Sequence, residues 1–228
     1  ENTFRFISIT FAQEFDTSCE KAGIDAREIT TLAATKPFGF MPFYAGPGIG
    51  GHCIAEDPYY LYQSMLDSGL SPKILESALA NHEARASVIV ERIIEHIGGR
   101  PLEGAKILLL GVSYKPNVGD ARRSPAQPIL ELLEAEGATV DYHDSLVAKF
   151  HGHTSVDLRA ASAVDYDVAV LITAHDGVNY HELMDAGWNI FDTRGAIKSA
   201  PVQRSARRSL QRLGETLGLG KTRIGGRS

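Results

Sequence analysis

Lys106-Ile-Leu-Leu-Leu-Gly111 is a short apolar run from which the fold class of this chain can be predicted. A short apolar run that ends in glycine is typical of a strand buried on both faces of a sheet. The chain repeats this pattern with helix signals between the runs, so strands are expected at 106–110, 139–142, 168–172 and 189–192, and helices over 124–136 and 180–186. Strands that alternate with helices indicate an α/β fold with a doubly wound parallel sheet.

The chain before this domain has helical periodicity. Apolar residues recur at helical spacing over residues 3–22, a short second helix fits 25–34, and a long helix is expected between Ser71-Pro72 and Gly98-Gly99. The sequence therefore predicts three parts: a central helical domain over 1–100, an α/β domain over 101–200 and a basic tail over 201–228. A helix as long as the one expected between Pro72 and Gly98 is typical of a bridge between domains or of a dimer contact.

Composition is that of a globular protein, with 43% hydrophobic and 22% charged residues in 228. No apolar run reaches the roughly 18 residues that a membrane span needs, so no membrane partner is expected. Two cysteines argue against a disulfide framework and favour a reducing cytoplasm. The chain begins in a helical pattern at Glu1-Asn2-Thr3 without an initiator Met, and we expect further sequence upstream.

The tail differs from the rest in charge. Residues 201–228 contain seven Lys or Arg and one Glu, whereas the whole chain has a formal net charge of −5. A basic segment can bind nucleic acid. This one lacks aromatic residues and any recognisable nucleic-acid motif, so we expect a solvated, poorly ordered tail and no nucleic-acid partner.

Residues 36–57 read as a long ordered loop that contains Gly46-Pro-Gly48-Ile-Gly50-Gly51-His52-Cys53. Four glycines in six residues let the backbone adopt positive φ and approach a ligand closely. A thiol beside such a loop is placed for covalent chemistry. The alternative is a flexible surface loop with an incidental cysteine, and we favour the reactive site. No metal site is expected.

Asp57 and His52 lie close to Cys53 in the sequence. Asp57 is a candidate general base for a water molecule. It is equally a candidate N-cap for a helix over 58–67 that begins with Pro58, and the two roles are compatible. A Cys53–His52 dyad is disfavoured, because adjacent side chains usually diverge.

Two segments imitate phosphate-binding loops. Gly46-x-Gly48-x-x-Gly51 matches the dinucleotide fingerprint, but no strand precedes it and no helix is expected to open straight after it. Residues 214–222 nearly match a P-loop with incorrect spacing and no strand before it. We therefore expect no complete dinucleotide-binding unit within this chain.

Cations follow the predicted strand ends. Lys115 and Arg122 lie between the first strand and the helix that starts at Ser124, where a helix N-terminus favours an anion. Arg194 follows the strand that ends at Asp192. Because ligands of doubly wound sheets bind at the carboxyl ends of strands, we favour an anion-binding rim over solvated loop charges.

Three segments resemble the UDP-glucose/GDP-mannose dehydrogenase family, most closely its bacterial UDP-N-acetylhexosamine 6-dehydrogenase branch. They are residues 36–61 (KPFGFMPFY through GPGIGGHC to DPYYL), 111–125 (GVSYKP through DARRSP) and 191–194 (FDTR). Residues 2–5 resemble the start of the central helix of the family. The resemblance spans about residues 1–198 and implies a helical dimerisation domain followed by a UDP-binding domain.

The resemblance implies a chemistry for these residues. NAD oxidises the C6 alcohol of a UDP-sugar to an aldehyde, Cys53 traps the aldehyde as a thiohemiacetal, and a second oxidation gives a thioester that water hydrolyses. Asp57 helps to activate the water, and Asn2 binds substrate and stabilises the oxyanion. The resemblance assigns substrate contacts to Tyr44, Gly46, Gly48, Gly50, Tyr114, Lys115 and Arg194, and a cofactor contact to Arg122.

The chain departs from the family in several places. The NAD-binding domain and the catalytic lysine of the family belong upstream of Glu1. Ala45 and Ala55 replace common prolines, Glu56 replaces a small apolar residue, and Arg123 replaces a usual acid. These changes are expected to loosen the loop without removing its chemistry.

The sequence thus predicts an NAD-dependent nucleotide-sugar 6-dehydrogenase, represented by its central and C-terminal portions, which binds UDP-sugar and forms a homodimer. The alternative is a truncated, non-catalytic module for UDP-sugar binding or dimerisation. A cysteine hydrolase is disfavoured, because no separated His–Asp pair is evident at a useful strand end.

Overall fold

A computed structural model of the chain describes residues 1–197. Within these residues two compact units form, one from Glu1–Glu14 with Phe43–Ile197 and one from Phe15–Pro42. The basic tail predicted over 201–228 lies outside the described residues. The predicted division of the chain near residue 100 stays a prediction.

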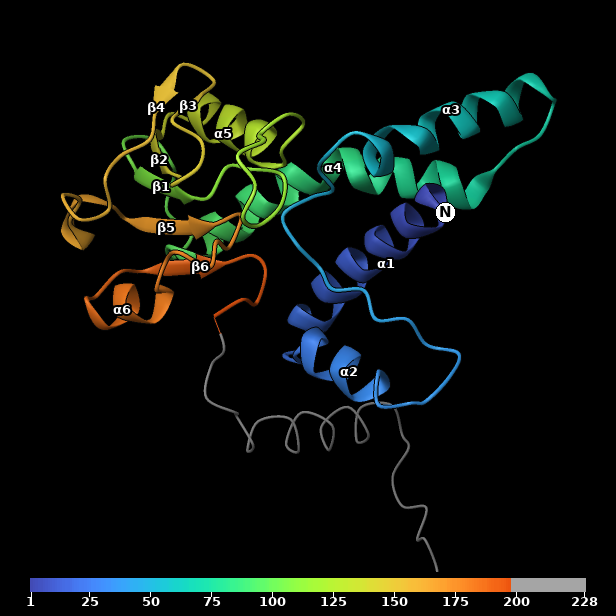
Figure 1. The fold of residues 1–228 in the computed structure, drawn as a ribbon, viewed down its shortest axis with the longest axis horizontal. Helices are drawn as coiled ribbons and strands as arrows, with labels where there is room; N and C mark the ends of the chain where they lie inside the picture. The colour runs from blue at the N-terminus through green and yellow to red at the C-terminus, as the bar shows by residue number, and fades with distance from the viewer. Residues whose placement is uncertain (198–228) are drawn as a thin grey trace, which may run out of the picture. The chain divides into compact units, whose positions relative to one another are not determined.

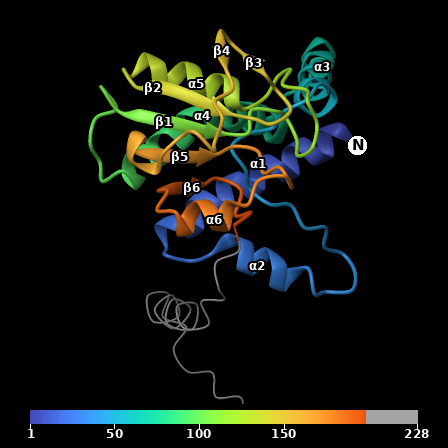
Figure 2. The same cartoon turned by 60° about the vertical axis from the view of Figure 1, so that its left-hand side comes forward.

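The larger unit contains a sheet of four parallel strands in the order β2-β1-β5-β6, which lie side by side in Figures 1 and 2. The strands are β1 Lys106–Leu110, β2 Thr139–His143, β5 Val168–Leu171 and β6 Ile190–Asp192. Leu110 at the end of β1 pairs with His143 of β2 and Leu171 of β5. The carboxyl ends of these strands therefore share one edge, and the predicted α/β fold with a parallel sheet is confirmed.

Both faces of this sheet are covered by helices. Successive strand residues point to opposite faces, so alternate residues of β1 belong to different cores. The helices of the described chain are α1 Asn2–Lys21, α2 Ala26–Ala33, α3 Cys53–Asp67, α4 Lys73–His96, α5 Ala126–Ala135 and α6 Tyr180–Asp185. Ile107 and Leu109 are buried in a core with residues of α4 and α5. Leu108 and Leu110 are buried on the other face with Trp188, against which residues of α6 pack.

The strand order reverses between β1 and β5, which is where ligands of doubly wound sheets bind. Gly111 follows β1 there with a φ of +76°, and its N–H donates to the carbonyl of His143 at 2.8 Å. A Cβ on Gly111 would lie 2.9 Å from Cβ of Thr173, the second residue after β5. Only glycine lets the two loops after β1 and β5 approach this closely.

The first turns of α1 belong to the larger unit and pack through Phe6. Its ring is 0% exposed and shares an apolar cluster with Ala55 of α3 and with Leu75 and Leu79 of α4. The helical periodicity of residues 3–22 predicted this helix to within one residue at each end. In the smaller unit α2 agrees with the helix predicted over 25–34 to within one residue at each end, and Asp25 is its N-cap.

Helix α3 differs from its prediction. It begins at Cys53 rather than at Pro58, and Pro58 lies inside it. Asp57 is therefore not an N-cap, and that prediction is wrong. The sequence analysis also missed the short antiparallel pair β3 Lys149–Phe150 and β4 His153–Thr154 and the 3₁₀ turn Ala163–Asp165, which are too short to show a periodicity.

Residues 36–52 form neither helix nor strand, as predicted, whereas residues 53–57, the end of the predicted loop, belong to α3. Within residues 1–197 none of the helices combines the length and the apolar character that crossing a membrane requires.

Candidate active site

The first turn of α3 carries the predicted nucleophile and the predicted base. Cys53 is the first helical residue and is exposed, and Asp57 follows four residues later. Residues four apart lie on the same face of an α-helix. The first-turn N–H groups have no partner within the helix and present partial positive charge beside Cys53. The early helix start thus places a thiol and a carboxylate on one face.

Asn2 approaches the same helix from a distant part of the sequence. It is the first residue of α1, and its side-chain Nδ2 donates a hydrogen bond to Oδ2 of Asp57 at 2.6 Å. The contact is partly buried. Three residues that the sequence singled out separately, Asn2, Cys53 and Asp57, are brought to one place by the packing of α1 against α3 and α4.

The glycine loop, residues 46–51, packs against the segment between β1 and α5. A Cβ on Gly48 would lie 2.8 Å from Cβ of Pro125, and one on Gly50 would lie 2.9 Å from Cδ of the same proline. Gly51 has a φ of +84°, and a Cβ there would lie 3.1 Å from the ring of Tyr114. These glycines are therefore needed for close packing within the chain. From the sequence they were expected only to let a ligand approach the backbone.

Gly46 lies between two arginines. Nε and Nη2 of Arg85 donate to its carbonyl oxygen at 3.0 and 2.8 Å. A Cβ on Gly46 would lie 3.4 Å from Nη1 of Arg194. Arg85 was not predicted as a site residue. Its place on the apolar face of α4, four residues before Ile89, was the available signal, because a buried guanidinium needs a partner.

Arg194 is tied to the carboxyl edge of the sheet. Its Nε donates to the carbonyl of Ile172 at 2.5 Å, and its backbone N–H donates to Asp192 at 2.9 Å. Burial lowers the pKa of the guanidinium from its usual value, while Asp192 opposes that shift. The predicted rim therefore contains Arg194 beside the glycine loop.

Lys115 and Tyr114 form a second part of the rim. Nζ of Lys115 lies 5.4 Å from the centre of the Tyr114 ring, which itself contacts the glycine loop. Lys115 is exposed, and Tyr114 is half-buried. Tyr44, the remaining predicted substrate residue, is exposed and lies two residues before Gly46.

Arg122 is separate from this group in its contacts. Its Nε and Nη2 bind the carboxylate of Asp120 at 2.7–3.1 Å, and its side chain is 89% exposed. Hydrogen bonds from Arg122 lower the pKa of Asp120 to about 2. The guanidinium is thus engaged within its own loop.

Two departures from the family pattern meet each other. Nη1 of Arg123 forms an ion pair with Oε1 of Glu56, whose side chain is only 12% exposed. Glu56 lies in α3, one residue before Asp57, and Arg123 lies in the loop that precedes α5. The pair links the helix that carries Cys53 to the loop before α5, although the sequence predicts looser packing from these two departures.

A cavity of about 640 Å³ borders this ion pair. It is lined by residues 47–49, by residues of α3 and α4 that include Tyr59 and His82, and by residues 123–125, 127 and 128. Cys53 and Asp57 are not among its lining residues. The cavity therefore does not support the assignment of Cys53 and Asp57 as site residues. That assignment depends on their shared helix face and on the hydrogen bond from Asn2 to Asp57.

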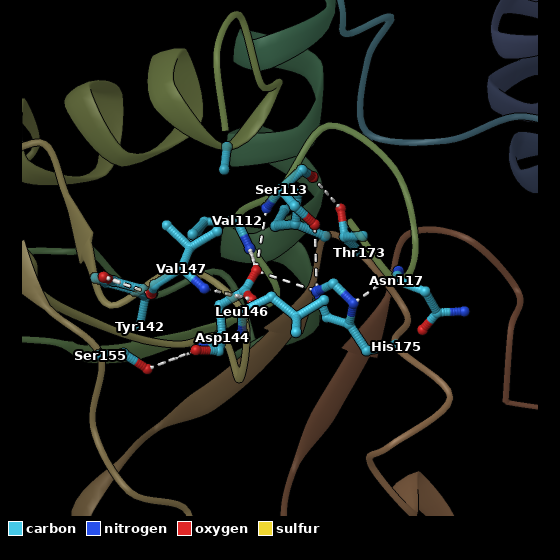
Figure 3. A network of polar contacts seen from close by, with 12 residues as sticks. Val112, Ser113, Asn117, Tyr142, Asp144, Leu146, Val147, Ser155, Thr173 and His175 are labelled. Carbon is cyan, nitrogen blue, oxygen red and sulfur yellow. Dashed lines mark hydrogen bonds and ion pairs between the residues drawn. The ribbon is translucent and has the colours of Figure 1, made fainter. Parts of the chain in front are cut away.

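A buried His–Asp pair exists at the strand ends, contrary to the sequence prediction. Nε2 of His175 lies 3.1 Å from Oδ2 of Asp144, and Oγ of Ser113 lies 3.2 Å from the same nitrogen (Figure 3). In a hydrolytic triad the serine and the acid contact opposite ring nitrogens. The side chains of His175 and Asp144 are 3% and 0% exposed, so this cluster does not have the geometry of a hydrolase.

Comparison with known proteins agrees with the resemblance of the three segments. A sequence model of the central domain of the UDP-glucose/GDP-mannose dehydrogenase family matches residues 1–83, and one of the UDP binding domain of that family matches residues 108–199. The UDP-N-acetyl-D-mannosamine dehydrogenase of Methanocaldococcus jannaschii is 32% identical over 177 residues, which cover 77% of this chain and 39% of that protein. The UDP-N-acetyl-D-glucosamine 6-dehydrogenase of Pseudomonas aeruginosa is 30% identical over 180 residues, which cover 77% and 42%.

A solved structure, that of the UDP-D-ManNAc dehydrogenase of Pyrococcus horikoshii, is similar with a TM-score of 0.75 and 27% identity. The match covers 89% of this chain and 48% of that one. The chain therefore spans about two fifths of the length of the curated relatives named above and about half of this structure.

Proposed function

Since the chain belongs to the UDP-glucose/GDP-mannose dehydrogenase family, we propose that it is the central and UDP-binding part of a nucleotide-sugar 6-dehydrogenase. The reaction converts the C6 alcohol of a UDP-hexose or UDP-N-acetylhexosamine to a carboxylic acid. One observation carries the proposal: Cys53 and Asp57 share a helix face, and Asn2 is hydrogen-bonded to that carboxylate at 2.6 Å.

In this proposal the UDP moiety binds at the carboxyl edge of the sheet. Lys115 and Arg194 supply positive charge for the diphosphate. Tyr114 offers a ring and a hydroxyl, and the backbone of Gly46–Gly50 approaches the same residues. The close packing of this loop against Tyr114 and Pro125 supports the proposal, because it fixes the loop beside the cations.

Cys53 handles the aldehyde stage of the oxidation. Its Sγ bonds to the aldehyde carbon while the thiol proton passes to the carbonyl oxygen, which gives a thiohemiacetal. Asn2 is the donor proposed for that oxygen. Trapping the aldehyde covalently keeps it bound until it is oxidised to the thioester.

Asp57 acts in the final hydrolysis. A water molecule adds to the thioester carbon as Asp57 accepts its proton. The C–S bond then breaks, the acid is released, and the sulfur regains a proton. The hydrogen bond from Asn2 orients the carboxylate for this step.

NAD, when bound, supplies the acceptor for the two hydrides. The described residues do not form a site for it. The fingerprint-like loop lies before a helix but follows no strand, and Arg122 is engaged with Asp120. We therefore assign cofactor binding to a part of the enzyme beyond residues 1–197 and keep Arg122 as a proposed peripheral contact.

The helical part is proposed to form a homodimer. Large apolar side chains are exposed on α1 and α3, among them Phe4 at 59% and Tyr60 at 69%. Such exposure supports a surface that another chain covers. A molar mass of one chain by light scattering at micromolar concentration would contradict the dimer.

The covalent step can be tested on the 228-residue chain alone. Reversible capture of a UDP-hexose 6-aldehyde should protect Cys53 from iodoacetamide, as measured by mass spectrometry of its peptide. Cys19, which is buried, serves as the internal control. An equal rate of Cys53 alkylation with and without the aldehyde would overturn the proposed role.

The binding step has its own test. Calorimetric titration with UDP should show binding that ADP does not reproduce, and the Lys115→Met variant should bind UDP more weakly. No detectable UDP binding at millimolar concentration would overturn the proposed function.

A further inference from the structure

The loop that carries Tyr114 and Lys115 is attached to a buried polar network at the switch point of the sheet. We define the His175 network as Ser113, Asp144 and His175, which follow β1, β2 and β5 (Figure 3). All three residues are buried. The proposed function uses the tip of this loop, yet gives no role to the network beneath it.

Asp144 is held by backbone donors on both sides. Its Oδ2 accepts from the N–H groups of Val112 and Ser113 at 2.8 and 3.1 Å, and its Oδ1 accepts from those of Leu146 and Val147 at 2.9 and 3.2 Å. Burial alone raises the pKa of this carboxyl, but these bonds, together with His175, outweigh burial and lower it. Asp144 is therefore a fixed anion at the base of the loop.

The two ring nitrogens of His175 have distinct partners. The backbone N–H of Asn117 can only donate, and it lies 3.0 Å from Nδ1. Nδ1 therefore accepts and has no proton. Nε2 faces the ionised Asp144, which can only accept, so Nε2 bears the proton. One neutral tautomer of His175 satisfies both contacts at once.

The network reaches the loop at both ends. Oγ of Ser113 donates to the carbonyl of Lys115 at 3.0 Å, and Oγ1 of Thr173 donates to the carbonyl of Ser113 at 2.7 Å. At the far end Asn117, which has a φ of +60°, binds Asp176 through both atoms of its amide group at 2.7 and 3.0 Å. The backbone on either side of Tyr114 and Lys115 is thus fixed by groups after β5.

We propose that His175 is a positioning residue for UDP binding, which holds the backbone of residues 113–117 so that Lys115 and Tyr114 meet the nucleotide. The inference rests on the proposed function, because it assumes that these two side chains contact UDP. Lys115 is exposed, its Nζ lies 5.4 Å from the centre of the Tyr114 ring, and its backbone carbonyl is anchored by the Ser113 hydroxyl. A shift of this anchor moves the charge away from the ligand.

Two substitutions separate hydrogen bonding from shape. His175→Phe keeps a ring and removes both polar contacts, whereas His175→Gln retains one donor for Asp144 and one acceptor for the N–H of Asn117. Tyr142→Phe is the matched control. It removes one buried hydrogen bond, from the Tyr142 hydroxyl to the carbonyl of Val147, without involving residues 113–117.

The readout is the affinity of the full 228-residue chain for UDP, measured by calorimetry. His175→Phe should weaken binding about tenfold or more, His175→Gln by no more than about threefold, and Tyr142→Phe should leave it unchanged. In a Lys115→Met background His175→Phe should cost much less, because the positioned group is already missing. Ser113→Ala, which removes one hydroxyl, should weaken binding about threefold and is the test if His175→Phe fails to fold.

Other results would contradict either the positioning role of His175 or the proposed function. Unchanged affinity in His175→Phe, or in Ser113→Ala where the former does not fold, overturns the positioning role and leaves the proposed function intact. The positioning role is also overturned if His175→Gln weakens UDP binding as much as His175→Phe does. The same holds if the effects of His175→Phe and Lys115→Met on UDP binding are fully additive. Failure of the unchanged chain to bind UDP overturns the proposed function, and the inference falls with it.

Discussion

Nδ2 of Asn2 lies 2.6 Å from Oδ2 of Asp57, although 55 residues separate them in the sequence. The amide can only donate through this atom, so the contact fixes the orientation of the carboxylate. Asp57 is one helical turn from Cys53. The start of α1 therefore controls the geometry of the proposed base.

Replacing Asn2 by Leu should slow the complete enzyme. The variant loses the donor proposed for the oxyanion and the partner of Asp57, and the loss of one such donor typically costs about 10²–10³ in rate. Formation of the uronic acid by the complete enzyme, measured as NADH produced, checks this. UDP affinity should stay the same, because Asn2 is assigned to the sugar C6 end. A rate within threefold of the unchanged enzyme would contradict the assignment.

The Glu56–Arg123 pair should behave as one unit. Arg123→Glu places two carboxylates together in a site where Glu56 is largely buried, and about 2–4 kcal/mol of unfolding free energy should be lost. The double variant Glu56→Arg/Arg123→Glu should recover part of that loss. Chemical denaturation of the single and double variants measures the coupling, and strictly additive effects would show that the ion pair does not link α3 to the loop before α5.

Gly51→Ala should destabilise the chain more than Gly69→Ala. Both glycines have positive φ, +84° and +76°, so both substitutions introduce a similar backbone strain. Only at Gly51 does a Cβ meet a neighbour, the ring of Tyr114 at 3.1 Å. We expect a cost of about 1 kcal/mol at Gly69 and about 2 kcal/mol or more at Gly51. Thermal unfolding checks the order, and equal costs would show that the Tyr114 ring yields freely.

Asp144 should contribute stability that depends on pH. Its folded pKa is lowered, so the contribution is present above the unfolded pKa of about 4 and is lost as pH falls through the folded pKa. The free energy of unfolding should therefore decrease below about pH 4–5. Asp144→Asn should be about 3 kcal/mol less stable at pH 7, because an amide cannot accept from all the N–H groups, and should show a weaker acid dependence. An unchanged slope in the variant would contradict this.

Local patterns predicted most of the secondary structure. The apolar run at Lys106 and its repeats mark strands because a strand buried on both faces has no polar positions, and α1 and α4 follow from apolar residues at helical spacing. The prediction failed at α3. Asp57-Pro58 has the form of a helix start, but Pro58 occupies the sixth position of a helix that begins at Cys53, and both Ala55 and Pro58 are buried there. Burial against other elements is not visible in the local pattern.

The strand and helix order, the glycine–cysteine loop and the family resemblance can all be read from the sequence, because each is encoded by neighbouring residues. Which side chains meet follows from the folded chain alone. The contacts of Asn2 with Asp57, Arg85 with Gly46, Glu56 with Arg123, and His175 with Asp144 join residues 31 to 67 positions apart. Such contacts depend on how helices and strands pack against one another, and periodicity along a single segment contains no information about them.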